Sequence, residues 1–516
     1  MTVRVVTAPQ AAARDAAAIG AGVPSRRLMQ TAGEAAAAVI MRRLSDRLPR
    51  GALVFTGPGN NGGDGWVVAR VLASHGVRVA VREVVESRTD DARAERETAL
   101  DTVSRDESSG GEGIVIDALL GTGSRGAPKG EIGAAVDQIN ALSAGGSAVV
   151  ALDVPTGLDA STGEATRAVR ADLTITFGTI KRGHVVARAR CGAIVVVDIG
   201  LGSWAELEDG APHLIDAGWV AERVPAIPAE AHKGVRRRIA IAGGAQGMAG
   251  ATILAARAAM RSGVGMVRLV VSTPSLAPVQ AAAVEATATT WPMSDAMITS
   301  EIGDYADAVL IGPGLGHGAD GKDFLERLLA VYEGPVVLDA DALNAFAGDV
   351  PRLARLLRGR PGIITPHVAE FARLVDATID EVLAQRFDIG RELARALNAV
   401  VLLKGVPTVI TAPDGTSVVS ASGTPVLAAA GSGDVLGGIV TTLLAQSEDP
   451  LASAACGAWM HGRAAEIANQ GRPIRGVTLA DVLNALGSAW AFDTRGPEPP
   501  VLAELPAVGE GEGRIR

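Results

Sequence analysis

Two glycine-rich segments, far apart in the chain, contain residue types that could bind phosphate groups. The first is GPGNNGGDG at 57–65 and the second is AAGSGDVLGG at 429–438. Each follows a β-like run, precedes a helical pattern and carries one carboxylate, Asp64 in the first and Asp434 in the second. Glycine-rich turns leave backbone N–H groups free to face an anion, and a helix N-terminus adds the positive end of its dipole. The pair predicts two phosphate-handling domains in tandem.

The second segment is the more specific, because Asp434 directly follows Gly-Ser-Gly at the start of a helix. A carboxylate beside an anion hole suits the deprotonation of a hydroxyl that then attacks a terminal phosphate. Backbone N–H groups would stabilise the charge that develops. The alternative is a simple helix N-cap with tight helix–sheet packing.

In the N-terminal half, three polar clusters follow β-like runs: 60–65, 117–127 (DALLGTGSRGA) and 153–159 (DVPTGLD). In open α/β sheets ligands bind beyond the carboxyl ends of the strands, so three such loops would meet in one crevice. The alternative is that each loop needs its Gly and Asp residues for turn geometry alone. Three loops at one sheet edge favour a binding site.

The elements that must position these loops alternate between β-like and helical patterns. A helix is predicted over 11–47, then β-like runs at 52–56, 77–81, 113–117, 148–152, 173–177 and 193–199. A polar, proline-containing linker is expected within 202–236. Beyond it we predict a helix at 250–262, helices after 434 and at 451–468, a hairpin of 408–411 with 417–420, and β-like runs at 238–244, 267–271, 308–312, 335–340, 362–366 and 399–405. Val- and Ile-rich runs separated by helices indicate parallel sheets covered on both faces.

Length and composition limit the function classes. A chain of 516 residues predicts more than one domain, and we place these at 1–213 and 214–494, with 495–516 as a Pro-, Gly- and Glu-rich tail expected to be disordered. The net charge of −9 argues against nucleic-acid binding. No run is long and apolar enough for a membrane span, and no signal peptide is evident. Two cysteines make a disulfide framework unexpected, so a cytoplasmic location is predicted. A homo-oligomer is also expected.

The motifs NNGGDG, LLGTG with a following Arg, and DVPTG resemble the NAD(P)H-hydrate epimerase family over most of 10–205. The resemblance implies a Rossmann-like three-layer domain that interconverts the R and S hydrates of NADH or NADPH, with Asp153 as the general acid/base. It implies a K⁺ ion held by Asn61, Asp117 and Thr156, where the family more often has Ser at the last position. The residues implied to bind the substrate are Asn60, Asn61, Gly62, Gly63, Asp64, Gly121, Thr122, Gly123, Ser124, Arg125, Gly126, Ala127 and Asp153.

The segment 230–490 resembles ADP/ATP-dependent NAD(P)H-hydrate dehydratases, which have a ribokinase-like α/β fold. The motifs occur in the family's order: HKG (232–234), 244–267, GPGLG (312–316), VLDADALN (337–344), TPHVAEFARLV (365–375), LLKGVPTVI (402–410) and the GSGD segment. The family phosphorylates the ring hydroxyl of the S hydrate and then eliminates phosphate to restore NAD(P)H. Asp434 would be the base, and ADP or ATP with Mg²⁺ the phosphate donor; the bacterial branch favours ADP, which gives AMP.

The same resemblance implies the ligand contacts. The nucleotide would be bound by Lys404, Gly405, Val406, Pro407, Thr408 and Gly433. The hydrate would contact Ala255, Gly316, His367 and Asp434. Asp341 and Asn344 would lie near the phosphates, and Glu370 would help to position Mg²⁺. The segment 424–429 departs from the family pattern Asn-x-Gly-Met-Ala-Thr, which puts hydroxyl contacts of that loop in doubt.

Several alternatives remain open at this point. His367 could simply cap the following helix, Glu370 could be a capping-box carboxylate, and Lys404 could be a solvated surface lysine. The C-terminal half could be a kinase of a vitamin alcohol, which the GSGD segment alone cannot distinguish. The N-terminal half could be a binding module that senses a nucleotide. The preferred hypothesis is a bifunctional repair enzyme, because a dehydratase that accepts one epimer leaves the other stranded.

Overall fold

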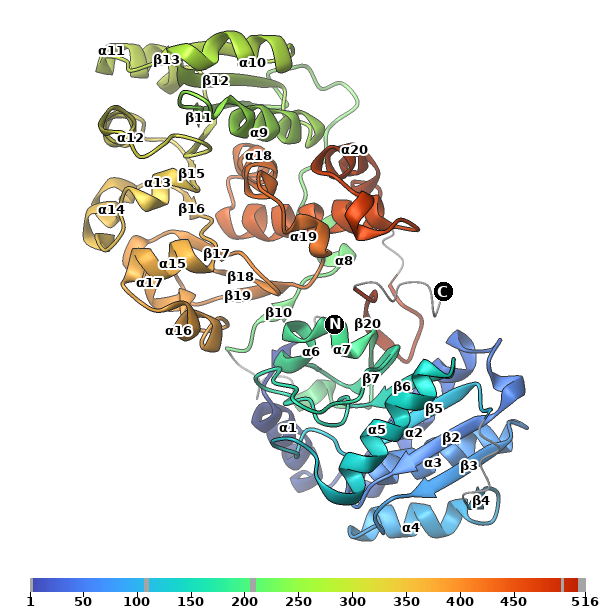
Figure 1. Cartoon of the computed structure of the whole chain (residues 1–516). Coiled ribbons are helices and arrows are strands. Elements are labelled where there is room, and N and C mark those ends of the chain that lie inside the picture. Colours follow the sequence, from blue (N-terminus) through green and yellow to red (C-terminus); the bar gives the residue numbers. More distant parts are fainter. Residues whose placement is uncertain (1–2, 106–110, 205–209, 493–495, 509–516) are drawn as a thin grey trace. The chain divides into compact units, whose positions relative to one another are not determined.

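The computed structural model describes residues 3–105, 111–204, 210–492 and 496–508 (Figure 1). The chain divides into two compact units. The N-terminal unit comprises Met1–His213 together with Gly496–Arg516, and the C-terminal unit comprises Leu214–Arg495.

The N-terminal unit is built on an eight-stranded sheet in the order β20-β9-β7-β6-β5-β2-β3-β4. All neighbouring strands are parallel except β20, which runs antiparallel to β9. The strands are β2 (Ala52–Thr56), β3 (Val79–Glu83), β4 (Ser104–Arg105), β5 (Ile114–Ala118), β6 (Ala148–Leu152), β7 (Leu173–Phe177), β9 (Ala193–Val197) and β20 (Val501–Leu505). A separate two-stranded sheet pairs β1 (Val5–Val6) with β8 (Ile180–Lys181).

Helices cover both faces of this sheet (Figure 1). Alternate residues of a strand face opposite sides; thus Val54 and Ile116 pack in one core cluster with residues of α2 and α3, whereas Phe55 and Val115 pack with residues of α5. The expected three-layer α/β arrangement is confirmed. The helices are α1 (Ala8–Gly20), α2 (Ser25–Arg43), α3 (Asn60–Ser74), α4 (Asp90–Ala99), α5 (Gly130–Ala144), α6 (Arg182–Val186) and α7 (Arg188–Cys191).

The prediction of one helix over 11–47 is wrong, because the chain forms α1 and α2 with a break between them. Gly22 has φ +100°, a left-handed conformation that ends α1, and Pro24 precedes the first residue of α2. Proline lacks an N–H and cannot continue a helix across this point. α1 also begins earlier than predicted, at a capping box formed by Thr7 and Gln10.

The C-terminal tail contains a strand, contrary to the expectation that 495–516 is disordered. β20 pairs with β9, Arg43 pairs with Glu504, and the Pro500 carbonyl accepts from the Asp198 N–H at 2.7 Å. Without β20, β9 would be an edge strand with unpaired backbone groups. Composition suggested disorder, but Val501 and Ala503 alternate with partly exposed residues and are each 5% exposed. Residues 509–516 of the predicted tail lie outside the described residues.

We expect a chain truncated after Arg495 to have a less stable N-terminal unit. Truncation exposes the apolar residues of β9 that β20 covers and removes the buried Val501, which should lower the free energy of unfolding by roughly 2–3 kcal/mol at ordinary transfer free energies. For a unit of this size, this corresponds to a melting temperature lower by about 4–10 °C. Thermal unfolding followed by circular dichroism measures this. The matched control removes only 509–516 and leaves β20 in place, so its melting temperature should equal that of the full chain. Equal values for both truncations would contradict the structural role of β20.

The C-terminal unit is built on a ten-stranded sheet in the order β10-β19-β18-β17-β16-β15-β14-β11-β12-β13. The run from β13 to β17 is parallel, and β17, β18 and β19 are antiparallel neighbours. The strands are β10 (His213–Leu214), β11 (Arg238–Gly243), β12 (Met266–Ser272), β13 (Thr287–Trp291), β14 (Ala308–Ile311), β15 (Val336–Leu338), β16 (Gly362–Ile364), β17 (Val400–Leu403), β18 (Thr408–Thr411) and β19 (Ser417–Ser420). The predicted hairpin is thus formed by β18 and β19.

Two cores lie on opposite faces of this sheet. Residues of α9, α18 and α19 pack with Ile239 and Ile241, whereas residues of α12, α14 and α15 pack with Ala240 and Ala242. The principal helices are α9 (Ala249–Arg261), α12 (Ala319–Val331), α13 (Asp341–Asn344), α14 (Val350–Leu357), α15 (Val368–Val375), α16 (Ile379–Ala384), α17 (Gly390–Leu397), α18 (Ser432–Ser447), α19 (Pro450–Asn469) and α20 (Leu479–Ala489). A mostly parallel α/β unit is confirmed.

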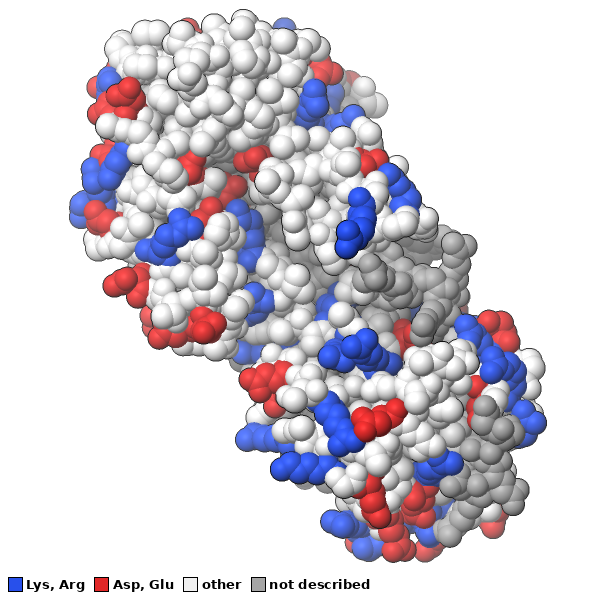
Figure 2. Space-filling model, in the orientation of Figure 1, with Lys and Arg blue, Asp and Glu red and all other residues white. Residues whose placement is uncertain are grey.

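The sequence prediction missed the edge strand β13. This strand is Thr-rich and only partly buried, so it lacks the apolar run by which the other strands were recognised. In the described part of the chain, no helix is both long and apolar enough to cross a membrane. On the face shown in Figure 2, acidic and basic side chains are interspersed over each unit.

Candidate active sites

The polar loops after β2, β5 and β6 come together, and several of their glycines are explained by close packing. A Cβ at Gly57 would lie 1.9 Å from the Leu119 carbonyl oxygen, and one at Gly62 would lie 2.0 Å from the Gly57 carbonyl oxygen. A Cβ at Gly121 would instead lie 3.3 Å from Asp153 Oδ2 and 3.4 Å from Asn61 Cβ. Close packing of the turns therefore explains why glycine is needed at 57 and 62. At Gly121, the missing Cβ leaves room for the Asp153 carboxylate and the Asn61 side chain to lie close together.

These loops line a cavity of about 640 Å³ in the N-terminal unit. The sequence-predicted residues that line it are Asn60, Asn61, Asp64, Gly121, Thr122, Gly123, Ser124 and Asp153. Gly62 and Gly63 are buried in α3 behind the lining. Arg125, Gly126 and Ala127 are exposed and lie outside the lining, so the structure does not bring them to the site. The opposite wall includes apolar residues of α1 and α2, which the sequence prediction did not include.

Asp153 has the geometry of a reactive group. Its φ of +61° is a left-handed backbone conformation that costs energy for a residue with a side chain. Its Oδ1 accepts from Lys181 Nζ at 2.6 Å and from Thr176 Oγ1 at 3.3 Å, and its Oδ2 accepts from the Thr122 N–H at 3.4 Å. Burial alone would raise the pKa of this carboxyl, but the Lys181 ammonium holds it below the usual value. Asp153 is therefore an ionised carboxylate at neutral pH.

Lys181 is a site residue that the sequence prediction missed. It lies in β8, is 2% exposed and lines the cavity. Its only sequence signal is its place shortly after the β-like run 173–177, at the same sheet edge as the other loops. His184, one turn later, is fully buried, which lowers its pKa to about 3, so its ring is neutral.

The three predicted K⁺ ligands, Asn61, Asp117 and Thr156, are all buried. Thr156 donates to Asp117 through both its N–H (2.8 Å) and its Oγ1 (2.7 Å), and the Leu120 N–H donates to Thr156 Oγ1 at 3.1 Å. Burial raises the pKa of Asp117 to about 6, against the hydrogen bonds from Thr156. The side-chain amide of Asn61 is buried, and neither its Oδ1 nor its Nδ2 has a protein partner. A buried amide oxygen without a partner, a carboxylate and a hydroxyl are oxygen donors of the kind that suits a hard cation.

In the C-terminal unit, Asp434 lies in the first turn of α18. Gly431 precedes the helix with φ +90°, and a Cβ there would lie 2.6 Å from Leu254 Cδ1, so the turn requires glycine. Burial raises the pKa of Asp434 to about 7, and the neighbouring Asp339 carboxylate adds to this effect. A carboxyl that titrates near neutral pH at a helix N-terminus suits general base chemistry.

Lys404 and Asp339 form the polar floor of this site. Lys404 Nζ donates to Asp339 Oδ1 at 2.7 Å and lies 3.7 Å from Glu370 Oε2. A Cβ at Gly433 would lie 3.3 Å from Lys404 Nζ and 3.4 Å from Asp339 Oδ2, which places both groups at the anion-hole turn. Lys404 is therefore not a solvated surface lysine. Asp339, which lies within the quoted VLDADALN motif, was not singled out from the sequence.

The capping alternatives for His367 and Glu370 are confirmed. His367 Nδ1 accepts from the N–H groups of Ala369 and Glu370, and Glu370 Oε2 accepts from the His367 N–H at 2.8 Å. The backbones of His367 and Lys404 form an isolated β-bridge. The capping box therefore lies beside the site, although its side chains cap the helix. The ring of His367 is half exposed, with Nε2 3.4 Å from Glu370 Oε1.

Of the remaining residues predicted to contact ligands, some lie together at the site and one is buried away from it. Asp341 Oδ2 accepts from the Gly316 N–H at 2.8 Å, so these two lie together, and Asp341 also acts on the pKa of Asp434. Asn344 Oδ1 accepts from Arg373. Ala255 is fully buried where α9 packs against α18, so the structure does not expose it to a ligand.

The loop expected to bind the nucleotide is partly exposed. Val406 is 62% exposed, and its carbonyl accepts from the buried Arg386. Thr408 Oγ1 donates to the Gly405 carbonyl at 3.1 Å, which closes the turn on itself. In the divergent segment 424–429, Thr424 Oγ1 accepts from the Val426 N–H, so this hydroxyl serves the local turn.

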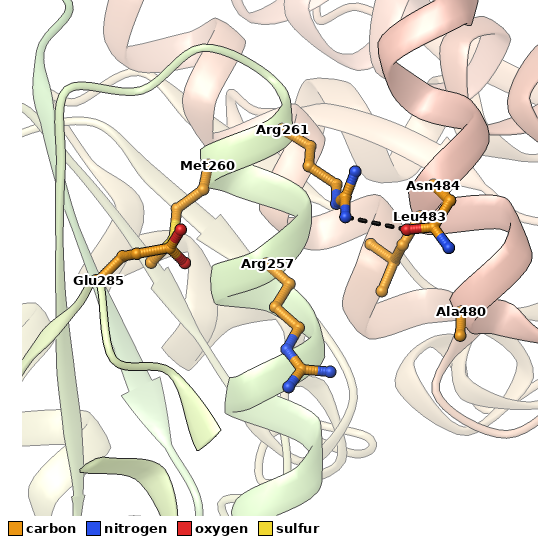
Figure 3. Close-up of a pocket in the computed structure, with 7 residues that line it drawn as sticks. All are labelled: Arg257, Met260, Arg261, Glu285, Ala480, Leu483 and Asn484. Atoms are coloured by element: carbon orange, nitrogen blue, oxygen red, sulfur yellow. Dashed lines mark hydrogen bonds between the residues drawn. The ribbon is translucent and has the colours of Figure 1, made fainter. Parts of the chain in front are cut away.

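Another pocket, of about 320 Å³, lies between α9 and α20 (Figure 3). Its residues are Arg257, Met260, Arg261, Glu285, Ala480, Leu483 and Asn484. Arg261 donates to Asn484 at 2.9 Å, and Arg257 donates to the Ala282 carbonyl. None of the sequence-predicted site residues lines it, so it is not the candidate site of this unit.

Comparison with known proteins assigns both halves of the chain. Residues 239–487 match the family model described as NAD(P)H-hydrate dehydratase, and residues 25–183 match the one described as YjeF-related protein N-terminus. The ADP/ATP-dependent NAD(P)H-hydrate dehydratase of Bacillus subtilis, crystallised with ATP and Mg²⁺, is 28% identical with a TM-score of 0.48, over 54% of this chain and 97% of that one.

Full-length relatives are similar to both halves at once. The bifunctional NAD(P)H-hydrate repair enzymes of Moorella thermoacetica and Salinibacter ruber are 34% and 36% identical, each over 90% of this chain and 92% of their own. The enzyme of that name from Escherichia coli is 34% identical over 90% of this chain and 89% of its own. Because this similarity spans both units, the chain belongs to the family of bifunctional NAD(P)H-hydrate repair enzymes.

Proposed function

We propose that this chain repairs hydrated nicotinamide cofactors in two steps, one in each unit. The N-terminal unit epimerises the R and S hydrates of NADH or NADPH, and the C-terminal unit dehydrates the S hydrate at the expense of ADP, giving AMP and phosphate. The observation that carries the proposal is one partly buried carboxylate with a shifted pKa in each unit, in a chain similar to the named relatives over nine-tenths of its length.

In the N-terminal cavity, Asp153 is proposed as the group that moves the proton of the ring hydroxyl, because it is ionised and lines the cavity. The lining residues at 60–64 and 121–124 would hold the rest of the ligand. K⁺ would be held by oxygens of Asn61, Asp117 and Thr156, and would supply a fixed positive charge near the ligand phosphates. The unpartnered Asn61 amide supports this assignment.

In the C-terminal unit, Asp434 is proposed to take the proton of the ring hydroxyl so that the oxygen attacks the terminal phosphate of the nucleotide. The free N–H groups at the start of α18 would stabilise the charge that develops on the phosphate. Lys404, in the segment 404–408, would contact the nucleotide together with Gly433. Hydrate contacts are proposed for Gly316 and His367.

Mg²⁺ would accompany the nucleotide and neutralise its phosphates. Within the described ranges, no three His, Cys, Asp or Glu side chains gather into a metal site. This fits Mg²⁺, which proteins commonly hold through one or two carboxylates and the phosphates of the substrate. Asp341 is the carboxylate we assign to it, because Glu370 already serves the capping box of α15.

The test is to incubate the mixed hydrates with the full chain, Mg²⁺, K⁺ and either ADP or ATP. Reduced-nicotinamide absorbance and free phosphate should rise together, and both epimers should be consumed. A stable phosphorylated product without phosphate release would favour a kinase of a small alcohol instead. Ligand binding in the N-terminal unit without any exchange of epimers would favour a sensing module. The same assay with NADH and NADPH hydrates measures the cofactor preference, and size-exclusion chromatography tests the proposed homo-oligomer.

The pH dependence of dehydration should report Asp434. Its pKa is about 7, and the base must be ionised, so kcat/KM should fall about tenfold per pH unit below pH 7 and level off above it. The Asp339 carboxylate contributes to this raised pKa, so an Asp339→Asn variant should move the midpoint to lower pH. Rate measurements on the S hydrate from pH 5 to 9 provide the check. A profile that is flat between pH 5 and 8 would contradict the assignment of the base.

A further inference from the structure

A concerted epimerisation in the N-terminal cavity would need a second proton-transfer group besides Asp153. In an NAD(P)H hydrate the hydroxyl-bearing carbon is bonded to the ring nitrogen. Inverting this carbon without oxidation or reduction requires one bond to that carbon to break and re-form from the other face. If the carbon–nitrogen bond breaks, the hydroxyl must lose a proton while the nitrogen gains one. When the two transfers are concerted, one group accepts a proton while another donates one.

Lys181 is the second ionisable group held directly against Asp153. Its Nζ lies 2.6 Å from Asp153 Oδ1 and 2.8 Å from Thr176 Oγ1. Its side chain is only 3% exposed, yet the residue lines the cavity. The backbone of β8 is fixed by pairing with β1, and the Lys181 N–H donates to His184 Nδ1 at 3.3 Å. A lysine that is buried and held in place at a cavity wall is positioned to act on a bound ligand, unlike a surface lysine that only balances charge.

The contacts around Asp153 favour Lys181 as the proton donor. Thr176 is fully buried; its hydroxyl donates to Asp153 Oδ1 and accepts from Lys181, so it holds the pair in register. His184 is buried and neutral, so it has no spare proton to give. Asp15 and Asp64 also line the cavity, and burial raises the pKa of both carboxyls, so they can hold protons there as well. Lys181 differs from them in its direct 2.6 Å contact with the Asp153 carboxylate.

We propose that Lys181 is a catalytic acid of the epimerase cavity, giving a proton to the ring nitrogen while Asp153 takes the proton of the ring hydroxyl. This inference rests on the proposed function of the N-terminal unit. The oxygen–hydrogen pair becomes the second bond of a carbonyl, the carbon–nitrogen bond breaks with its electron pair on nitrogen, and nitrogen takes the Lys181 proton. Rotation of the freed carbonyl and reversal of each transfer closes the ring on the opposite face. No oxidant, reductant or further reactant is needed.

The experiment uses the full chain and starts from pure R hydrate, with K⁺, Mg²⁺ and ADP. A Lys181→Arg variant keeps the positive charge beside Asp153, but guanidinium does not give up its proton at neutral pH. We expect its epimerisation to fall at least 100-fold. A Lys181→Ala variant should lose epimerisation as well, and added methylamine should restore it in proportion to the amine concentration. The matched control is Lys129→Met, an exposed lysine before α5, which should leave the rate unchanged.

Dehydration of pure S hydrate by the same samples reports whether the chain is folded and the C-terminal unit active. If the wild-type chain consumes S hydrate but never R hydrate, the proposed epimerase function fails, whatever Lys181 does. If the wild type epimerises and Lys181→Arg stays within tenfold of it, the inference about Lys181 is overturned. It is equally overturned if Lys181→Ala is inactive and methylamine gives no recovery.

Discussion

An Asp434→Asn variant should lose nucleotide-dependent dehydration while it still exchanges the two epimers. General base catalysis typically contributes about 10²–10⁴-fold, and we expect the loss to lie within that range. Asn has the same shape as Asp and keeps a hydrogen-bonding oxygen, but it cannot take a proton from the ring hydroxyl. The measurement follows reduced-nicotinamide absorbance and phosphate release from the S hydrate, with epimer exchange followed separately by chromatography.

Stability separates this catalytic loss from unfolding. Folding raises the pKa of Asp434 from 3.8 to about 7, so the folded chain binds this proton more tightly than the unfolded chain. The ionised carboxylate therefore costs stability above pH 7, by about 4 kcal/mol at most from this shift, and costs none below pH 4. At pH 8 the Asn variant should be at least as stable as the wild type.

The matched control for this variant is Asp414→Asn, which changes an exposed carboxylate in the turn between β18 and β19 of the same unit. It should dehydrate at the wild-type rate. An Asp434→Asn chain that still released phosphate and restored absorbance at a tenth of the wild-type rate or more would show that another group is the base.

An Asp153→Asn variant should have the opposite phenotype. The S hydrate should be repaired at the wild-type rate, while conversion of the R hydrate should fall at least 100-fold. With a racemic mixture, absorbance should then recover in two phases, a fast one for the S form and a slow one limited by uncatalysed exchange. Absorbance traces of the Asp153→Asn variant and of the wild-type chain, recorded on the same mixture, measure both phases directly.

The substitution also leaves the Lys181 ammonium buried without a counter-charge. Removing one partner of a buried ion pair typically costs about 3–5 kcal/mol, so the N-terminal unit should melt at a lower temperature. Epimerisation must therefore be assayed well below that transition. Asp137→Asn is the control, because Asp137 is exposed and its pair with Arg167 lies at the surface. A single fast phase with Asp153→Asn would contradict the division of the reaction between two sites.

Much of the fold could be predicted because the signals were local. The limits of β2, β6, β7, β18 and β19 coincide with those predicted, since each strand is a short Val-, Ile- or Thr-rich run bounded by turn residues. The tail strand β20 escaped prediction, because a Pro- and Glu-rich composition says nothing about an unpaired edge elsewhere in the chain. Gly22 and Pro24 indicate the break between α1 and α2, but the alanine-rich periodicity on both sides of them favoured a single helix.

The sequence by itself indicated the two candidate carboxylates, Asp434 through the Gly-Ser-Gly turn before it and Asp153 through the resemblance of its DVPTG motif to the epimerase family. Only the tertiary structure decided what each carboxylate is. Asp153 is paired with Lys181, 28 residues away, and is held ionised. Asp434 is partly buried near Asp339, and its pKa rises to about 7. Burial and charge act through space and not along the chain, so the pKa values of two similar residues moved in opposite directions for reasons that spacing does not encode.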